Sequence, residues 1–362
     1  MNFNKIIFSI CLCVIILCGC KKQQYEVRIP DINGLAYEYV MEAEEAFGKE
    51  DYNGAMAAYL KAEEVCNSPD YTDENEVSYL YYAMGTCYIK LTEYHKAKEY
   101  FDKSLAISEK MDNEELNFEN YKYLAKIHRA IVDRNPDLAL NYAEKAENLA
   151  LSLYGEKSQQ VAGCYSEQGR IYFDMGNSDK AYDYLIMAIK TYKENSEESA
   201  SVYMDLAKVY QQQELYDEEK ECLEKAASIF ESSNSLNGMV EVYNCLGNFY
   251  CENNDFETSI LFFDKCLEIL KKTGAENYTL AECHYNKGYT YYVAEDYEAS
   301  KKEMMDAYQI CKGLPMQSEL TEAMESKIKG NMKIYYDYIY EGDKVTGFES
   351  WFEQLVSSEP LS

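Results

Sequence analysis

The sequence predicts an all-α fold of about seven stacked helix-turn-helix repeats, closed at the C-terminal end by capping helices. Two observations predict it. A short motif around a glycine or alanine recurs along the chain, and the 362 residues include only 5 Pro and 17 Gly with 47% hydrophobic residues, which is typical of a folded helical protein. Length alone would also allow two or three ordinary domains, so the repeats decide the architecture.

Each repeat has two halves. The first contains the small marker residue with a tyrosine three positions later, as in Gly85 and Tyr88. Nine residues after the tyrosine a second apolar pattern begins, as in Ala97-x3-Phe101, and turn residues lie between the halves. The pattern therefore predicts helix, tight turn, helix. The markers are 38 to 44 residues apart: Ala43, Gly85, Ala125, Gly169, Ala207, Gly247 and Gly288.

These motifs resemble the tetratricopeptide repeat, which has Leu-Gly-x2-Tyr on its first helix and Ala-x3-Phe-x2-Ala on its second. The resemblance covers residues 35–312 and implies a right-handed α-solenoid. One helix pair cannot bury its own apolar face, so each pair needs its neighbours and the array needs capped ends. We expect residues 313–362 to supply a capping helix and a short amphipathic tail helix.

The first 19 residues have the parts of an export signal. Lys5 precedes an apolar run over residues 6–17, which is too short for a bilayer that needs about 20 residues. The run ends in Leu17-Cys18-Gly19-Cys20, which resembles the lipobox of bacterial lipoproteins. An ordinary secretory signal with chance cysteines is the alternative.

The lipobox resemblance implies that Cys20 is acylated and becomes the mature N-terminus. Acyl chains there would hold the protein at a membrane. Lys21 follows the cysteine, and in lipoproteins of double-membraned bacteria a residue other than Asp at this position implies the outer membrane. Residues 20–34 are therefore expected to be the lipidated cysteine and a polar tether, and the location the cell envelope, on the periplasmic side or the cell surface.

Charge and side-chain chemistry exclude several classes. The formal net charge of −29 excludes nucleic-acid binding, which depends on phosphate neutralisation. Four of the 13 cysteines belong to the signal, and the other nine occur singly at apolar helical positions, which predicts core residues rather than disulfides or a metal site. Three scattered histidines and the absence of catalytic motifs predict a protein that is not an enzyme and needs no cofactor.

The resemblance also implies a ligand surface, because first helices line the concave face in this family. One hypothesis is a groove that binds a protein or peptide segment carrying carboxylates, with Lys and Arg pairing the charges, Asn holding the main chain and Tyr packing apolar parts. The alternative is that these residues are solvated and offset neighbouring acids. The candidate residues are Lys122, Lys126, Arg129, Arg170, Lys208, Asn244, Asn248, Tyr285, Asn286, Tyr289 and Tyr292.

Near the C-terminus, Phe348, Trp351, Phe352 and Leu355 form an amphipathic helical stripe that contains the only tryptophan. Such a short helix must dock on something, so it either covers the last repeat or contacts a partner. Taken together, the sequence predicts a membrane-anchored interaction scaffold of the bacterial envelope. A nutrient- or glycan-binding surface lipoprotein and an envelope sensor component are the alternatives.

Overall fold

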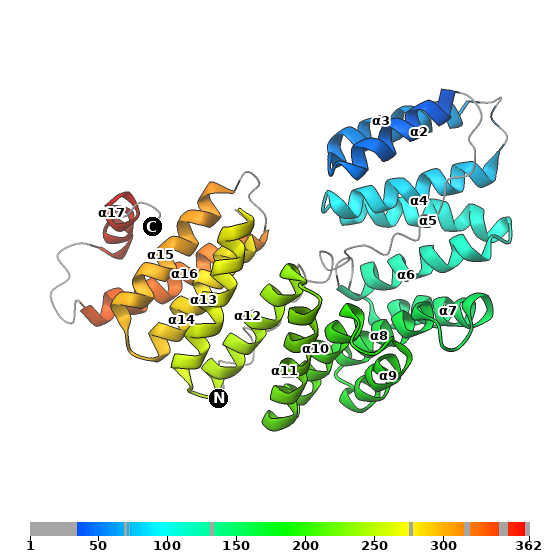
Figure 1. Ribbon diagram of the computed structural model, residues 1–362. Helices are drawn as coiled ribbons and strands as arrows, with labels where there is room; N and C mark the ends of the chain where they lie inside the picture. Colours follow the sequence, from blue (N-terminus) through cyan, green and yellow to red (C-terminus); the bar gives the residue numbers. More distant parts are fainter. Residues whose placement is uncertain are drawn as a thin grey trace. The chain divides into compact units, whose positions relative to one another are not determined.

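The computed structural model describes residues 35–68, 71, 73–130, 134–274, 278–314, 319–339 and 347–358 (Figure 1). Within these ranges every regular element is an α-helix and no strand occurs, which confirms the predicted all-α fold. The chain divides into two compact units, Met1–Leu215 and Tyr216–Ser362, and each is a stack of helical hairpins. The signal segment, Cys20 and the tether lie outside the described residues.

The first unit contains four helical hairpins and one further first helix. Each second helix also contacts the first helix of the next hairpin, so the apolar faces are covered in sequence order. The helices are α2 (Leu35–Gly48), α3 (Tyr52–Cys66), α4 (Glu74–Lys90), α5 (Tyr94–Lys110), α6 (Glu114–Ala130), α7 (Pro136–Tyr154), α8 (Gln159–Asp174), α9 (Ser178–Thr191) and α10 (Glu197–Gln212).

The second unit begins with a second helix, continues with two hairpins and ends with two further helices. Its first helices α12, α14 and α16 also contact one another in a row, as α6, α8 and α10 do in the first unit. The helices are α11 (Tyr216–Ser232), α12 (Leu236–Glu252), α13 (Phe256–Thr273), α14 (Tyr278–Val293), α15 (Tyr297–Gly313), α16 (Glu319–Ile339) and α17 (Phe348–Ser358).

Tight turns with a left-handed residue join the two helices of a hairpin. Gly176 has φ 75° between α8 and α9, and Asn254 has φ 61° between α12 and α13. Glycine and asparagine reach this region at low cost, which is why the predicted turns fall there. The next polar residue caps the second helix: the side chain of Asn177 accepts from the N–H of Lys180, and that of Asp255 from the N–H of Thr258.

The marker glycines let the two helices of a hairpin approach closely. A Cβ added at Gly247 would lie 2.7 Å from a ring carbon of Phe263, and one at Gly169 would lie 2.7 Å from Cγ of Leu185. The hydroxyl of Ser259 adds a hydrogen bond to the carbonyl of Gly247 at 2.7 Å. The small marker is therefore required because the large side chain of the second helix occupies the space of a β-carbon.

Most cysteines of the described residues are buried in the helical core, as the sequence interpretation predicted. Cys87 and Cys266 are each 0% exposed, and their thiols donate to the carbonyls of Tyr52 and Val240. Burial raises the pKa of the Cys87 thiol to about 12, so this group is a neutral core residue and a weak nucleophile.

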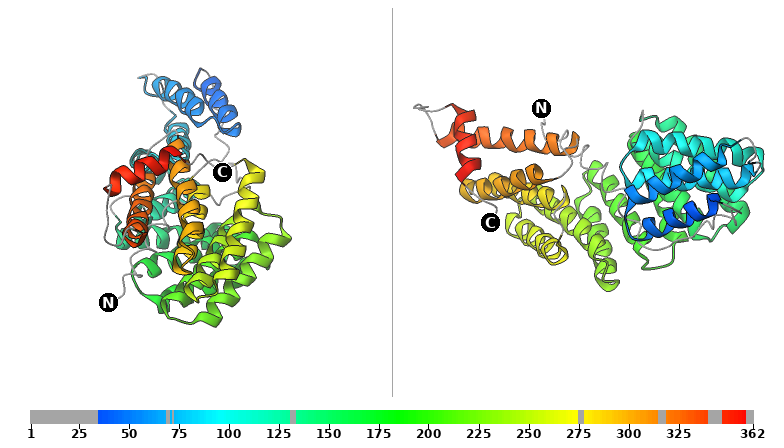
Figure 2. Two further views of the ribbon diagram at one scale, coloured as in Figure 1. Left: turned by 90° about the vertical axis from the view of Figure 1, so that its left-hand side faces the viewer. Right: turned by 90° about the horizontal axis from the view of Figure 1, so that it is seen from above.

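Helix α17 packs across α15 and α16 at the end of the second unit (Figure 2). Phe352 is 2% exposed, and its ring meets the ring of Tyr308 on α15 edge-on at 5.1 Å between centroids. Trp351 lies 5.2 Å from the ring of Tyr336 on α16. Phe348 and Leu355 belong to the same apolar cluster, so α17 packs on the last helices of the second unit.

Among the described helices, none combines the length and apolar content that crossing a membrane requires.

Gly247→Ala should destabilise the protein by about 1–3 kcal/mol, because the new methyl group meets the Phe263 ring in a packed core. The measurement is the shift in the urea unfolding midpoint. Gly330→Ala is the matched control: Gly330 is helical and nothing lies within 4 Å of an added Cβ, so helix propensity should make that variant equal or more stable. Equal effects of the two substitutions would contradict the close approach.

Candidate functional site

In the first unit, the predicted basic residues meet carboxylates from neighbouring first helices. Arg129 on α6 donates from Nε to Glu167 on α8 at 2.7 Å and from Nη1 to Asp174 at 2.9 Å. Its side chain is 1% exposed and that of Glu167 is 7% exposed. A buried guanidinium is tolerated only when carboxylates compensate it, and here two do so.

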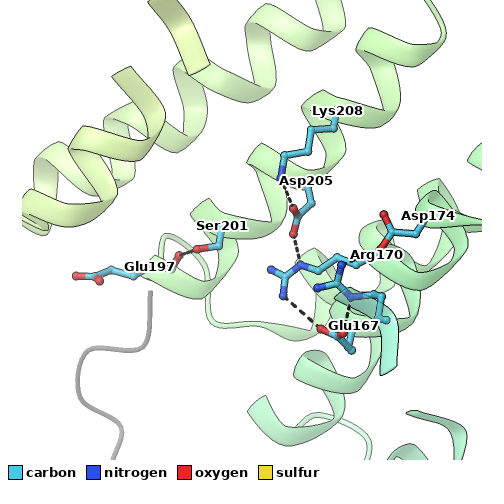
Figure 3. A network of polar contacts seen from close by, with 8 residues as sticks. Glu167, Arg170, Asp174, Glu197, Ser201, Asp205 and Lys208 are labelled. Atoms are coloured by element: carbon cyan, nitrogen blue, oxygen red, sulfur yellow. Dashed lines mark hydrogen bonds and ion pairs between the residues drawn. The ribbon is translucent and has the colours of Figure 1, made fainter. Parts of the chain in front are cut away.

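The chain of ion pairs continues from α8 to α10, as Figure 3 shows. Arg170 donates from Nε to Asp205 at 2.5 Å, and the other oxygen of Asp205 accepts from Lys208 at 3.0 Å. Arg170 also lies 3.6 Å from Glu167, which joins the two halves of the network. Asp205 thus occupies the position between two cations that a ligand carboxylate would take.

The electrostatics agree with this pairing. Burial acts to raise the pKa of Asp205, but Arg170 and Lys208 outweigh it and lower the pKa to about 2. The pKa of Glu167 is likewise lowered, because Arg129 and Arg170 outweigh the effect of its burial. Both groups are ionised at neutral pH, so the network is close to neutral overall.

Two further predicted lysines lie on α6. Lys122 forms an ion pair with Glu119 one turn earlier, with Nζ 3.0 Å from both carboxylate oxygens. Lys126 is half-buried and contributes to lowering the pKa of Glu167. The structure therefore joins Arg129, Arg170 and Lys208 in one network with carboxylates of the chain, whereas Lys122 pairs separately with Glu119.

In the second unit, the predicted Asn and Tyr residues line the row of first helices α12, α14 and α16. Asn286 on α14 donates from Nδ2 to Oδ1 of Asn244 on α12 at 3.0 Å. Asn331 on α16 donates to the hydroxyl of Tyr285 on α14 at 3.3 Å. Asn248 lies one helical turn after Asn244 and is half-buried, so amide groups follow one another along this face.

Aromatic rings lie next to the amides. Tyr289 and Tyr292 on α14 stack with centroids 6.3 Å apart, and both are half-buried. Tyr285 is 6% exposed, so its ring packs beneath this surface and is not accessible to a partner. We call the half-buried residues Asn244, Asn248, Asn286, Tyr289 and Tyr292 the Asn/Tyr face. It combines amide donors and acceptors with apolar area, and it carries no charge.

Sequence reasoning missed the acidic members of the first network. Glu167 precedes Arg170 by three residues and Asp205 precedes Lys208 by three, a spacing that places each pair on one helix face. This three-residue spacing was a sequence signal from which the two pairings could have been predicted. The pairings from one helix to the next, Arg129 to Glu167 and Arg170 to Asp205, join residues 38 and 35 positions apart and could not be read from local spacing.

Comparison with known families finds tetratricopeptide repeat matches over residues 165–232 and 78–111. These two segments therefore match the tetratricopeptide repeat. They include the markers Gly85, Gly169 and Ala207, on which the sequence interpretation rested. Repeats of this type generally act as non-catalytic scaffolds that bind proteins or peptides. Comparison with curated proteins gives no match.

Solved structures of repeat proteins share the fold. The apo form of RapI is 14% identical, with a TM-score of 0.61, and the alignment covers 82% of this chain and 98% of that one. A signal transduction ATPase with a tetratricopeptide repeat sensor, from Pyrococcus horikoshii, is 21% identical with a TM-score of 0.57. That alignment covers 82% of this chain and 44% of the ATPase. At these identities the likeness shows the helical repeat fold alone.

Arg129→Met should destabilise the protein by about 3–5 kcal/mol, because it leaves the buried Glu167 carboxylate without its main partner. Lys110→Met is the control, since Lys110 pairs with Glu74 on the exposed surface and such pairs contribute at most about 1 kcal/mol. Urea unfolding measures both. The double variant Arg129→Met, Glu167→Gln should recover part of the loss; no recovery would show that the charge of Glu167 is not the cause.

Proposed function

We propose that this protein is a lipid-anchored scaffold of the bacterial cell envelope, which binds other proteins or peptides through its first-helix surface. Two features support the proposal. The chain contains tetratricopeptide repeats, and residues 17–20 read Leu-Cys-Gly-Cys after a short apolar run, as in lipoproteins. Acylated Cys20 would keep the repeats at a membrane, and Lys21 favours the outer membrane as the location.

The Asn/Tyr face is the surface to which we assign binding. The observation that carries this assignment is the amide pair of Asn244 and Asn286, which is half-buried beside the rings of Tyr289 and Tyr292. The pair uses one Asn286 donor and one Asn244 acceptor, and each amide has capacity for further bonds. Such a face suits an extended or helical segment that offers main-chain N–H and C=O groups and apolar side chains.

The pairing in the first unit argues against strongly acidic partners there. Arg129, Arg170 and Lys208 are neutralised by the chain's own carboxylates, so an incoming carboxylate would first have to displace Asp205 or Asp174. Lys126 differs from the other basic candidates of the first unit, because it forms no ion pair within the described residues. No ion pair with the described carboxylates therefore competes with an acidic segment for this lysine. Charge reversal at Arg170 would damage the fold and is unsuitable as a binding test.

Replacing Asn244, Asn286 and Tyr289 together by Ala should reduce partner recovery at least tenfold, since each lost hydrogen bond contributes about 0.5–1.5 kcal/mol. The measurement is quantitative mass spectrometry after cross-linking in intact cells and affinity capture of the full chain. The matched control replaces Tyr182, Tyr216 and Leu261, which are exposed residues of second helices. Unchanged recovery with the first variant, at an unchanged melting temperature, would disprove the assignment of the face.

Cys20→Ala should release the protein from the membrane fraction, because the acyl chains supply the attachment. Metabolic labelling with an alkyne fatty acid and separation of inner and outer membranes measure this directly. Cys13→Ala, within the predicted signal, is the control and should leave labelling unchanged. Labelling of Cys20→Ala at the level of the natural sequence, or recovery of the natural protein without lipid, would disprove the anchor.

A further inference from the structure

A hollow of about 400 Å³ lies in the second unit, between the second helices α13 and α15, with α14 as its floor. Its walls are almost wholly charged. Asp264 comes from α13, His284 and Lys287 from α14, and Glu303 and Asp306 from α15. The hollow and the Asn/Tyr face share no residues, and the proposed binding function does not involve the hollow.

Three of these side chains converge as potential metal ligands. His284, Glu303 and Asp306 each offer one ligand atom, and the three atoms lie within 4.8 Å of one another. Nδ1 of His284 is 2.7 Å from Oε2 of Glu303. Glu303 and Asp306 are three residues apart on α15, so both carboxylates lie on the same side of that helix and face the imidazole from α14.

The burial of these groups sets them apart from an ordinary acidic surface. His284 is 7% exposed and Asp306 is 6% exposed. Holding an imidazole and two carboxylates together, largely out of water, is costly unless a cation compensates them. Lys287 supplies part of that charge, since its ammonium lies 2.7 Å from Oε1 of Glu303 and 2.8 Å from Asp264.

We propose that His284, Glu303 and Asp306 bind a divalent transition-metal ion, with zinc as the ion that fits best. An imidazole nitrogen with two carboxylates is a zinc ligand set, whereas calcium and magnesium take oxygen ligands. Two ligands at about 2.0–2.1 Å from a tetrahedral ion are about 3.3 Å apart. The Nδ1 to Oε2 distance of 2.7 Å would open by less than 1 Å, a small rotation of two side chains.

Lys287 sets the affinity of the site. Its ammonium shares Glu303 with the ion, so a divalent cation binds against this fixed positive charge, and Lys271 and Lys302 also line the hollow. The hollow beside the three ligands leaves room for water as the fourth ligand. A bound ion would link α14 to α15 by metal bonds and would therefore stabilise this hairpin.

The test is titration of the full-length protein, in detergent micelles and without a histidine tag, with ZnCl₂ by isothermal calorimetry. We expect one ion per chain, with affinity at least tenfold weaker in His284→Gln and in Asp306→Asn. His95→Gln is the control, because His95 is exposed on α5 in the other unit, and its affinity should not change. Lys287→Met should bind several-fold more tightly, since it removes the competing charge.

Two readouts keep the proposal falsifiable if a ligand variant folds poorly. Circular dichroism reports the fold of each variant, and Co²⁺ substitution should give d–d bands without the intense thiolate charge-transfer band that binding to cysteine would produce. The proposal is overturned by the absence of saturable zinc binding, by binding that His284→Gln and Asp306→Asn leave unchanged, by weaker or equal binding in Lys287→Met, or by a thiolate band. Adventitious zinc on thiols falls under the last outcome.

Discussion

The contact on which the rest of the structure depends is the one between a marker glycine and the large side chain of the second helix. At Gly247 and Gly169 the ring of Phe263 and the branched chain of Leu185 fill the place of a β-carbon. This fixes the distance between the two helices of a hairpin. Because each hairpin then has a defined second-helix surface, the next first helix packs on it in a regular way, and successive first helices fall into a row.

That row is held together by polar side chains whose character differs between the two units. In the first unit the links are ionic, as between Arg170 and Asp205, and in the second they are amides, as between Asn286 and Asn244. Elsewhere several carboxylates of this acidic chain accept from tyrosine hydroxyls. A tyrosine hydroxyl donates to a carboxylate without adding a charge. Examples are Tyr100 with Glu63, Tyr121 with Glu109, Tyr243 with Glu231 and Tyr335 with Glu298.

The features that could be predicted from the sequence are those fixed within one hairpin. The turn at Asn254 and the cap at Asp255 depend on residues a few positions apart, and the marker at Gly247 faces Phe263 of the same hairpin, 16 positions later. The polar links between successive first helices could not be predicted, because the partners are separated by 35 or more residues and depend on how the helices are rotated. Glu219 illustrates the limit: it stands where other repeats have Ala or Ser, yet it is 4% exposed, and burial beside Glu252 raises its pKa to about 8. The division of the repeats into two units after Leu215 also had no sequence signal.

Helix α14 carries both proposed sites on opposite sides, and this follows from helical periodicity. His284 and Lys287 are three positions apart and face the second helices, where both contact the carboxylate of Glu303. Residues 286 and 289 are also three apart but are displaced by two positions, about 200° around the axis, and they belong to the Asn/Tyr face. A rigid helix shared by two sites transmits a change in its position but not a change in a single side chain. An ion that alters only the rotamers of His284 and Glu303 would therefore leave peptide binding unchanged. An ion that shifts α14 against α15 would alter the Asn/Tyr face as well as the metal site. The coupling free energy between the two sites would thus measure how far the helix moves.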